Sequence, residues 1–547
     1  MDGPIRRSRA RVVARPPWPL AVGLFALFAC GVSQGCGDSK AKDDAPNVAP
    51  ECALPSRVRR LTRAELDHAA SALVGPTTLF TESLAAEDRP LGFDNHDGLV
   101  VSGLIVDQLA VVSGKLADRV VADPHWSCAA DERACFDAFL ADFVTRAFRR
   151  SVTNEERDGL FNVFQAGRDG ADYAAGIHLV AEAVFQSTGF LYRTELGRDG
   201  SPGVRILEGH ELASELSFLV TGGPPDADLT RAANEGKLTD PDTRAQHARR
   251  LLATEQGRKR LEDFVLQWFG VSELEAIQKD NLVFPDYSAD WRASMRAETH
   301  AFVEQVFREG DGKVATLLGA DYTFVDDRMA EFYGLPDRPG PTPARVKLPP
   351  ERRGLLTQAS ILATYAHFGD TSPVHRGKMV YTSLLCGEMP PPPATVNTSL
   401  PVPDGERTGR ERLRAHTGNP SCAGCHSIMD PIGLGFEDFD GIGKHRTTEI
   451  GAPVDASGKL VTPKASGDAP SFVGGAQGAG LIASNAEVEA CAQKQLFRYG
   501  FGRRESYGAC EMGDVREALQ QSGGDLREAL VAYVRSTAFS ARKEQTP

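Results

Sequence analysis

The amino-acid sequence predicts a mainly α protein made of several helical blocks, with one minor β-hairpin. Apolar residues recur at helical spacing along most of the chain, as Phe136, Phe139, Leu140 and Phe143 do. Regular alternation of apolar and polar residues is rare, and only the segment 454–460 predicts a hairpin. Because 547 residues exceed what one small core accommodates, we expect several packed domains.

The first thirty residues differ from the rest of the chain. Several arginines precede an apolar run from Trp18 to Ala29, which predicts a signal sequence over 1–30. The run is too short to span a bilayer comfortably, and small residues beside Cys30 indicate cleavage with lipid attachment there; Cys36 is the alternative. Residues 31–52 predict a flexible tether. We therefore expect an exported, membrane-anchored lipoprotein, periplasmic or on the cell surface, although a plain secretory signal or an uncleaved anchor fits the same pattern.

Helix-start signals and composition divide the remainder into blocks. Thr62 with Glu65, and Thr153 with Glu156, have the spacing of capping boxes, in which a hydroxyl and a carboxylate satisfy amide groups at a helix start. A long helix is expected over 290–309. Pro, Gly and Arg are concentrated between residues 334 and 350, which indicates a boundary. The expected domains are helical ones over 53–125, 126–200 and 201–335, a further one over 350–475, and a C-terminal helical one over 476–547.

The charge of the chain argues against nucleic acid as a partner. The net charge is -13 at pH 7, and the isoelectric point is near 5.5. Lysine and arginine are interspersed with acidic residues along the helical segments, without the basic stripe that phosphate binding requires.

Export changes how the ten cysteines are interpreted, because an oxidising compartment favours disulfides. Neighbours in sequence are the first candidates. Cys128 and Cys135 lie seven residues apart, and Cys491 and Cys510 bracket a helix and a turn. We therefore predict the disulfides Cys128–Cys135 and Cys491–Cys510. Cys52 and Cys386 remain, and for them both a pairing across domains and a buried free thiol stay open.

A strong chemical signal follows the break at Gly418-Asn419-Pro420. The segment Cys422-Ala423-Gly424-Cys425-His426 places two thiols on one helical turn, where they face the two vinyl groups of a porphyrin, and the histidine follows as proximal iron ligand. With ten cysteines and twelve histidines, on the order of 0.004 random matches are expected. The rival is zinc held by the two cysteines with His426 or His445, but a second close cysteine pair is not nearby. The sequence therefore favours one covalently attached haem c.

The sixth iron ligand is left open by the sequence. Met429 lies one helical turn after His426 and so on the same side of the iron. The remaining candidates are Met512, His416, Met389 and Met379. A closed site favours electron transfer, and a methionine raises the potential, whereas an open position permits peroxide or oxygen chemistry.

Several further segments occur in one order along the chain. They are Leu61-Thr62-Arg63-Ala64-Glu65-Leu66, Arg146-Ala147-Phe148-Arg149-Arg150, Arg353-Gly354-Leu355-Leu356, Thr371-Ser372-Pro373 with Arg376-Gly377, and the segment from Cys422 to Pro431. In this order they resemble a family of large secreted proteins, abundant in planctomycetes and myxobacteria, made of five consecutive domains of unknown function with a cytochrome c-like haem motif. The resemblance covers about residues 53 to 540. It implies a mainly helical, exported, haem-bearing protein with a small C-terminal cytochrome c-like haem region, and it supplies no substrate.

Three classes of function are compatible with these features. The first is single-electron transfer in the cell envelope, with a redox partner protein that the sequence does not identify. The second is a haem-dependent oxidoreductase or peroxidase that acts on an extracellular or surface substrate; the length of the chain favours it, since a bare carrier needs one small domain. The third is a structural envelope lipoprotein. The haem motif is the only chemistry that the sequence displays, and it favours the first class.

Overall fold

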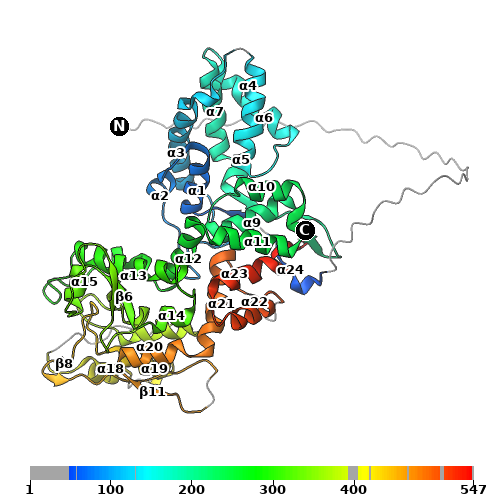
Figure 1. Cartoon of the computed structure of the whole chain (residues 1–547). Coiled ribbons are helices and arrows are strands. Elements are labelled where there is room, and N and C mark those ends of the chain that lie inside the picture. Colours follow the sequence, from blue (N-terminus) through cyan, green and yellow to red (C-terminus); the bar gives the residue numbers. More distant parts are fainter. Residues whose placement is uncertain are drawn as a thin grey trace, which may run out of the picture. The chain divides into compact units, whose positions relative to one another are not determined.

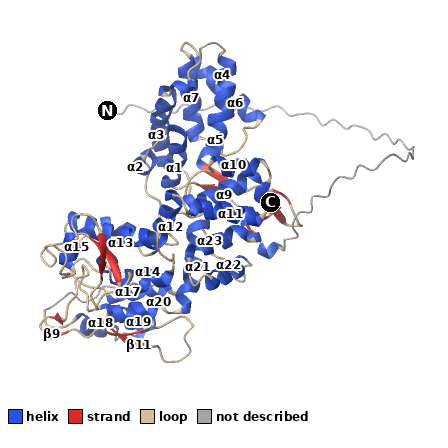
Figure 2. Cartoon of the chain, viewed as in Figure 1, coloured by secondary structure: helices blue, strands red, loops and turns tan. Residues whose placement is uncertain are grey.

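The structure is a computed structural model, and it is mainly α with short strand pairs, as the sequence predicts (Figures 1 and 2). The signal sequence, Cys30, Cys36 and most of the tether lie outside the described residues. Within the described part of the chain, no helix is long and apolar enough to cross a bilayer. The described residues are 48–56, 58–129, 131–391, 405–417, 420–464, 467–505 and 510–544.

The N-terminal helices share one hydrophobic core, which runs from Leu61 to Phe218. Both predicted capping boxes are present, Thr62 with Glu65 at the start of α1 and Thr153 with Glu156 at the start of α6. Helix α7 packs against both α3 and α6 (Figure 1). The helices of this region are α1 (Arg63–Val74), α2 (Leu79–Ser83), α3 (Gly103–Ala122), α4 (Glu132–Phe139), α5 (Thr145–Phe148), α6 (Asn154–Arg168), α7 (Tyr173–Gln186) and α8 (Thr188–Leu191), with a π-helical segment over Leu140–Val144.

The remaining helices enclose most of a second, larger core, whose buried residues lie mainly between Leu207 and Phe539 and also include Leu54 and Phe93. The long helix expected over 290–309 is α13. These helices are α9 (Gly209–Thr221), α10 (Ala227–Asn234), α11 (Pro241–Leu252), α12 (Glu255–Trp268), α13 (Ala289–Arg308), α14 (Val314–Gly319), α15 (Asp327–Phe332), α16 (Ala359–Thr364), α17 (Pro373–Met379), α18 (Gly409–Thr417), α19 (Pro420–Gly433), α20 (Gly475–Ala483), α21 (Ala486–Phe501), α22 (Glu511–Gln521), α23 (Leu526–Arg535) and α24 (Thr537–Ser540). Short 3-10 turns cover Pro50–Cys52, Pro124–Trp126, Lys237–Thr239, Val271–Ala276, Leu355–Thr357 and Leu434–Phe436, and Val380–Leu384 is π-helical.

The strands bring distant parts of the chain together. In the largest sheet the order is β1-β12-β5-β4, and β1 runs parallel to β12, so the first and last described strands are adjacent. The strands are β1 (Leu54–Pro55), β2 (Val58–Arg60), β3 (Tyr192–Thr194), β4 (Arg198–Asp199), β5 (Val204–Ile206), β6 (Tyr322–Val325), β7 (Ala344–Lys347), β8 (Thr448–Glu449), β9 (Ala452–Pro453), β10 (Ser457–Lys459), β11 (Ser471–Val473) and β12 (Ala541–Lys543). The other pairs are β2-β3, β6-β7, β8-β9 and β10-β11, all antiparallel.

The single predicted hairpin over 454–460 was wrong in its partner. Strand β10 does lie in this segment, but it pairs with β11, with Ser457 opposite Val473. The sequence also missed the other strand pairs. Strands of two to four residues carry too little alternation to be recognised, and some of their partners, as in β1-β12 and β2-β3, come from distant segments.

The disulfides confirm one predicted pair and correct the other. Cys128 is joined to Cys135, as predicted. The predicted pair Cys491–Cys510 is wrong, because Cys491 is joined to Cys386 and Cys510 to Cys52. Cys491 is buried within α21, where it meets Cys386 just after the π-helical segment. Cys510 directly precedes α22 and meets Cys52 near the start of the described chain. Folding thus supplied partners 105 and 458 residues away.

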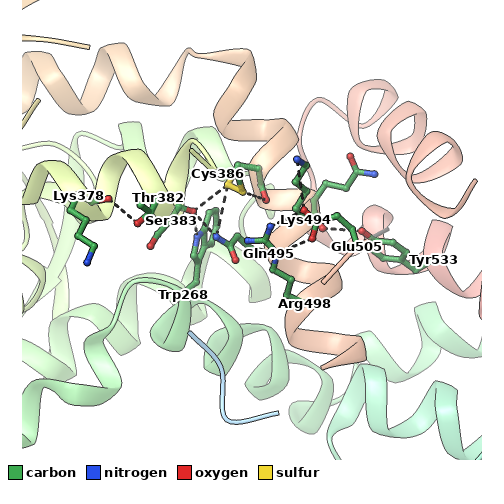
Figure 3. Close-up of a disulfide and its surroundings, with 12 residues drawn as sticks. Trp268, Lys378, Thr382, Ser383, Cys386, Lys494, Gln495, Arg498, Glu505 and Tyr533 are labelled. Atoms are coloured by element: carbon green, nitrogen blue, oxygen red, sulfur yellow. Dashed lines mark hydrogen bonds and ion pairs between the residues drawn. A yellow bond between two sulfur atoms is a disulfide. The ribbon is translucent and has the colours of Figure 1, made fainter. Parts of the chain in front are cut away.

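The Cys386–Cys491 disulfide lies in a hydrogen-bonded setting (Figure 3). The carbonyl oxygen of Ser383 accepts hydrogen bonds from the indole nitrogen of Trp268 at 2.7 Å and from the amide of Gln495 at 3.0 Å. Helices α12 and α21 therefore meet the same carbonyl at the C-terminal end of the π-helical segment. The disulfide fixes covalently a junction that these hydrogen bonds also hold.

A buried carboxyl group lies in the core of the middle region. Glu298 on α13 accepts hydrogen bonds from the hydroxyl groups of Thr323 at 2.8 Å and Tyr333 at 2.6 Å. Burial raises the pKa of Glu298 from 4.5 to about 7, although both hydroxyl groups and Arg352 favour the charged form. The free energy of folding is therefore expected to depend on pH through this residue.

Candidate functional site

Helix α19 carries the Cys422–His426 motif and crosses α17 in direct backbone contact. A Cβ atom added to Gly377 on α17 would lie 2.0 Å from the carbonyl oxygen of Met429, and one added to Gly433 would lie 1.7 Å from the carbonyl oxygen of Pro373. Only glycine permits this approach, because any side chain would separate the two helices. The crossing sets the position of the helix from which the motif projects.

The two thiols of the motif remain unpaired in a chain rich in disulfides. Cys422 is buried and Cys425 is half-buried, and they are the only cysteines outside a disulfide among the described residues. A separation of three residues places both on one side of α19. Gly424, between them, is exposed, and an added Cβ there would meet no atom within 4 Å.

The imidazole of His426 is held by a carboxylate on its own helix. Its Nδ1 lies 2.9 Å from Oδ1 of Asp430, and the two side chains are only 14% and 12% exposed. An ionised carboxylate accepts a hydrogen bond from Nδ1–H, and this tautomer leaves the lone pair on Nε2 for a metal. Sequence reasoning missed Asp430, although a spacing of four residues on a predicted helix is the signal that identifies such a pair.

Helix α19 contains a proline inside its last turn. It continues to Gly433 with Pro431 inside it. Proline removes one helical hydrogen bond. The backbone contact between Gly433 and Pro373 of α17 holds this last turn in place, so tertiary packing overrides the local preference.

The chain after α19 is fixed by a buried arginine. Arg376 of α17 donates hydrogen bonds to the carbonyl oxygens of Phe436 at 2.8 Å, Phe439 at 3.0 Å and Asp440 at 2.7 Å. Glu437 lies against the same guanidinium, and burial raises the pKa of this carboxyl group even though Arg376 opposes the shift. One residue of α17 thus orients the segment that closes around the base of α19.

The four candidates for the sixth ligand lie in different surroundings. Met512 is buried beside Tyr533, whose hydroxyl lies 3.7 Å from its sulfur atom, and Met379 is buried in the same large core. Met389 is partly buried against that core. His416, on α18, is the candidate that the structure brings to the motif: its ring centre lies 5.4 Å from that of His426, with 70° between the ring planes.

The zinc alternative finds no assembled set of ligands. Among the described residues, no three His, Cys, Asp or Glu side chains are gathered closely enough to hold a metal ion. His445 faces the ring of Phe439, at 5.7 Å between ring centres. A site in which protein side chains alone complete a tetrahedron is therefore not favoured by this arrangement.

The sequence models of four protein families match the chain in tandem. In chain order they are Protein of unknown function (DUF1587) over residues 59–122, DUF1595 over 135–195, DUF1592 over 207–335 and DUF1588, which is called PSCyt3, over 352–449. The last range contains helices α17, α18 and α19 and the cysteine motif. No curated protein and no solved structure matches the chain. Four such domains in tandem support the placement of this chain in the family of proteins built from consecutive domains of unknown function.

Proposed function

We propose that this chain is an exported c-type haem protein that transfers single electrons in the cell envelope. The observation that carries the proposal is the state of the motif: its two thiols alone stay outside disulfides among the described cysteines, beside a histidine held at Nδ1 by Asp430. The name PSCyt3, given to the model that matches residues 352–449, points in the same direction.

The residues present fit the haem group that the motif implies. Cys422 and Cys425 would form the two thioether bonds, and His426 would bind the iron through Nε2. Haem supplies one-electron exchange when bound. Asp430 orients the imidazole and increases its basicity, while the crossing of α17 over α19 keeps the motif in a fixed place.

Export and lipid attachment belong to the same proposal. Disulfides persist in oxidising compartments, and the three in the described residues support export. We propose Cys30, or alternatively Cys36, as the lipidated residue. Metabolic labelling with a fatty acid tests this: label should be lost from Cys30→Ser and retained in Cys36→Ser. Label lost from Cys36→Ser and retained in Cys30→Ser would assign the anchor to Cys36. Absence of label from the wild type and from both variants would refute lipid attachment.

The haem proposal is tested by expression of the full chain together with a cytochrome c maturation system. We expect haem that stays with the polypeptide after denaturation in the wild type, and its loss in the double variant Cys422→Ser/Cys425→Ser. The matched control is Cys128→Ser/Cys135→Ser, which removes another close pair of cysteines and should retain haem. Zinc without covalent haem in the wild type, or haem retained by the motif variant, would refute the proposal.

A further inference from the structure

Two imidazole rings from consecutive helices lie close together, edge to face, at the motif. His416 lies in the last turn of α18 and His426 in the first half of α19, and their ring centres are 5.4 Å apart at an interplanar angle of 70°. Helices α18 and α19 pack side by side (Figure 1). The structure thus places a second nitrogen donor beside the histidine that the motif assigns to the iron.

His416 has no competing partner within the described part of the chain. No hydrogen bond or ion pair to its ring is found there, whereas His426 is engaged at Nδ1 by Asp430. The methionine candidates differ from it, because Met512 and Met379 are buried in apolar contacts of the large core. A histidine that is half-buried and without a partner is the donor still available for binding.

We propose that His416 is the sixth iron ligand, so that the haem is held by two histidines; this inference rests on the proposed function. Two imidazoles that bind one metal ion from opposite sides have ring centres about 6 Å apart, because each metal–nitrogen bond is about 2 Å long and each bonded nitrogen lies about 1 Å from its ring centre. The observed 5.4 Å lies within a small adjustment of that spacing. Met512, Met389 and Met379 are then structural residues.

The assignment restricts the chemistry of the site. With His416 and His426 both bound to the iron, no position would remain for oxygen or peroxide. Such a site suits electron transfer rather than peroxide chemistry. The potential is also expected to lie below that of a histidine–methionine site, since methionine raises it.

The test uses the matured full-length protein and spectra instead of activity. In the wild type we expect the haem iron to be low-spin and, when reduced, to resist binding of carbon monoxide. His416→Ala should become high-spin and bind carbon monoxide rapidly, and added imidazole should restore the low-spin spectrum. His416→Met should stay low-spin with a higher potential. The control is His375→Ala, which removes an exposed histidine of α17 and should leave the spectrum unchanged.

Failure of this inference is separable from failure of the proposed function. Covalent haem with an unchanged spectrum in His416→Ala would overturn the ligand assignment alone, as would rapid carbon monoxide binding by the wild type. A wild type without covalent haem would instead overturn the proposed function, and the ligand assignment would fall with it.

Discussion

Replacing Cys386 and Cys491 together by alanine removes the disulfide that ties α21 to the domain matched over 352–449. The crosslink closes a loop of 105 residues, for which the chain-entropy treatment gives about 4.8 kcal/mol at 25 °C. Cys491 is also almost fully buried, so its truncation loses contacts as well. We expect the free energy of unfolding to fall by roughly 5 kcal/mol.

The Cys128–Cys135 disulfide supplies a matched comparison. It closes a loop of only seven residues, for which the same treatment gives about 2.4 kcal/mol. Both cysteines lie on the edge of the N-terminal core and are less buried than Cys491. The long-range pair should therefore cost about 2.4 kcal/mol more than the local pair when each is removed.

Urea unfolding of the wild type and both double variants, followed by circular dichroism, measures these differences. Mass determination without reductant establishes that the remaining disulfides are formed in each protein. Tryptophan fluorescence, to which Trp268 beside the disulfide contributes, gives a second measure of unfolding. Equal losses in the two variants, or a wild-type value for Cys386→Ala/Cys491→Ala, would refute the reasoning that loop closure governs the contribution.

Three further predictions concern the site and the core. In the haem-loaded protein, Asp430→Asn replaces a charged acceptor by a neutral one, and loss of about 1 kcal/mol of charge-assisted bonding should raise the potential by about 40 mV in a redox titration; an unchanged or lower potential would count against the role of Asp430. Because burial raises the pKa of Glu298 from 4.5 to about 7, the folded state retains a proton that the unfolded state releases, and the unfolding free energy should fall by up to about 3 kcal/mol as pH rises through this window. Glu298→Gln should remove that fall in unfolding free energy, measured by urea titrations between about pH 5 and 8. A pH profile identical to that of the wild type would contradict the assignment. Gly377→Ala should destabilise by about 1–3 kcal/mol because the new Cβ meets the backbone of α19, whereas Gly424→Ala, an open helical position, should be neutral or stabilising by up to about 1 kcal/mol; equal effects in thermal unfolding would exclude the close crossing.

Short-range features of the protein followed from its sequence. The capping boxes at Thr62 and Thr153 were predictable because their two halves lie within one helical turn. The pair Cys128–Cys135 was predictable for the same reason, since a short loop already brings both sulfurs near each other. The spacing of Cys422, Cys425 and His426 likewise defines which side chains share one face of a helix.

Tertiary structure decided the features that depend on distant segments. The partners of Cys491 and Cys510 lie 105 and 458 residues away, and β1 pairs with β12 at the other end of the chain. Local propensity holds no information on such contacts, because the packing of whole helices determines which surfaces meet. The sequence left four candidates open, His416 among them. The packing of α18 against α19 is what places its ring beside His426.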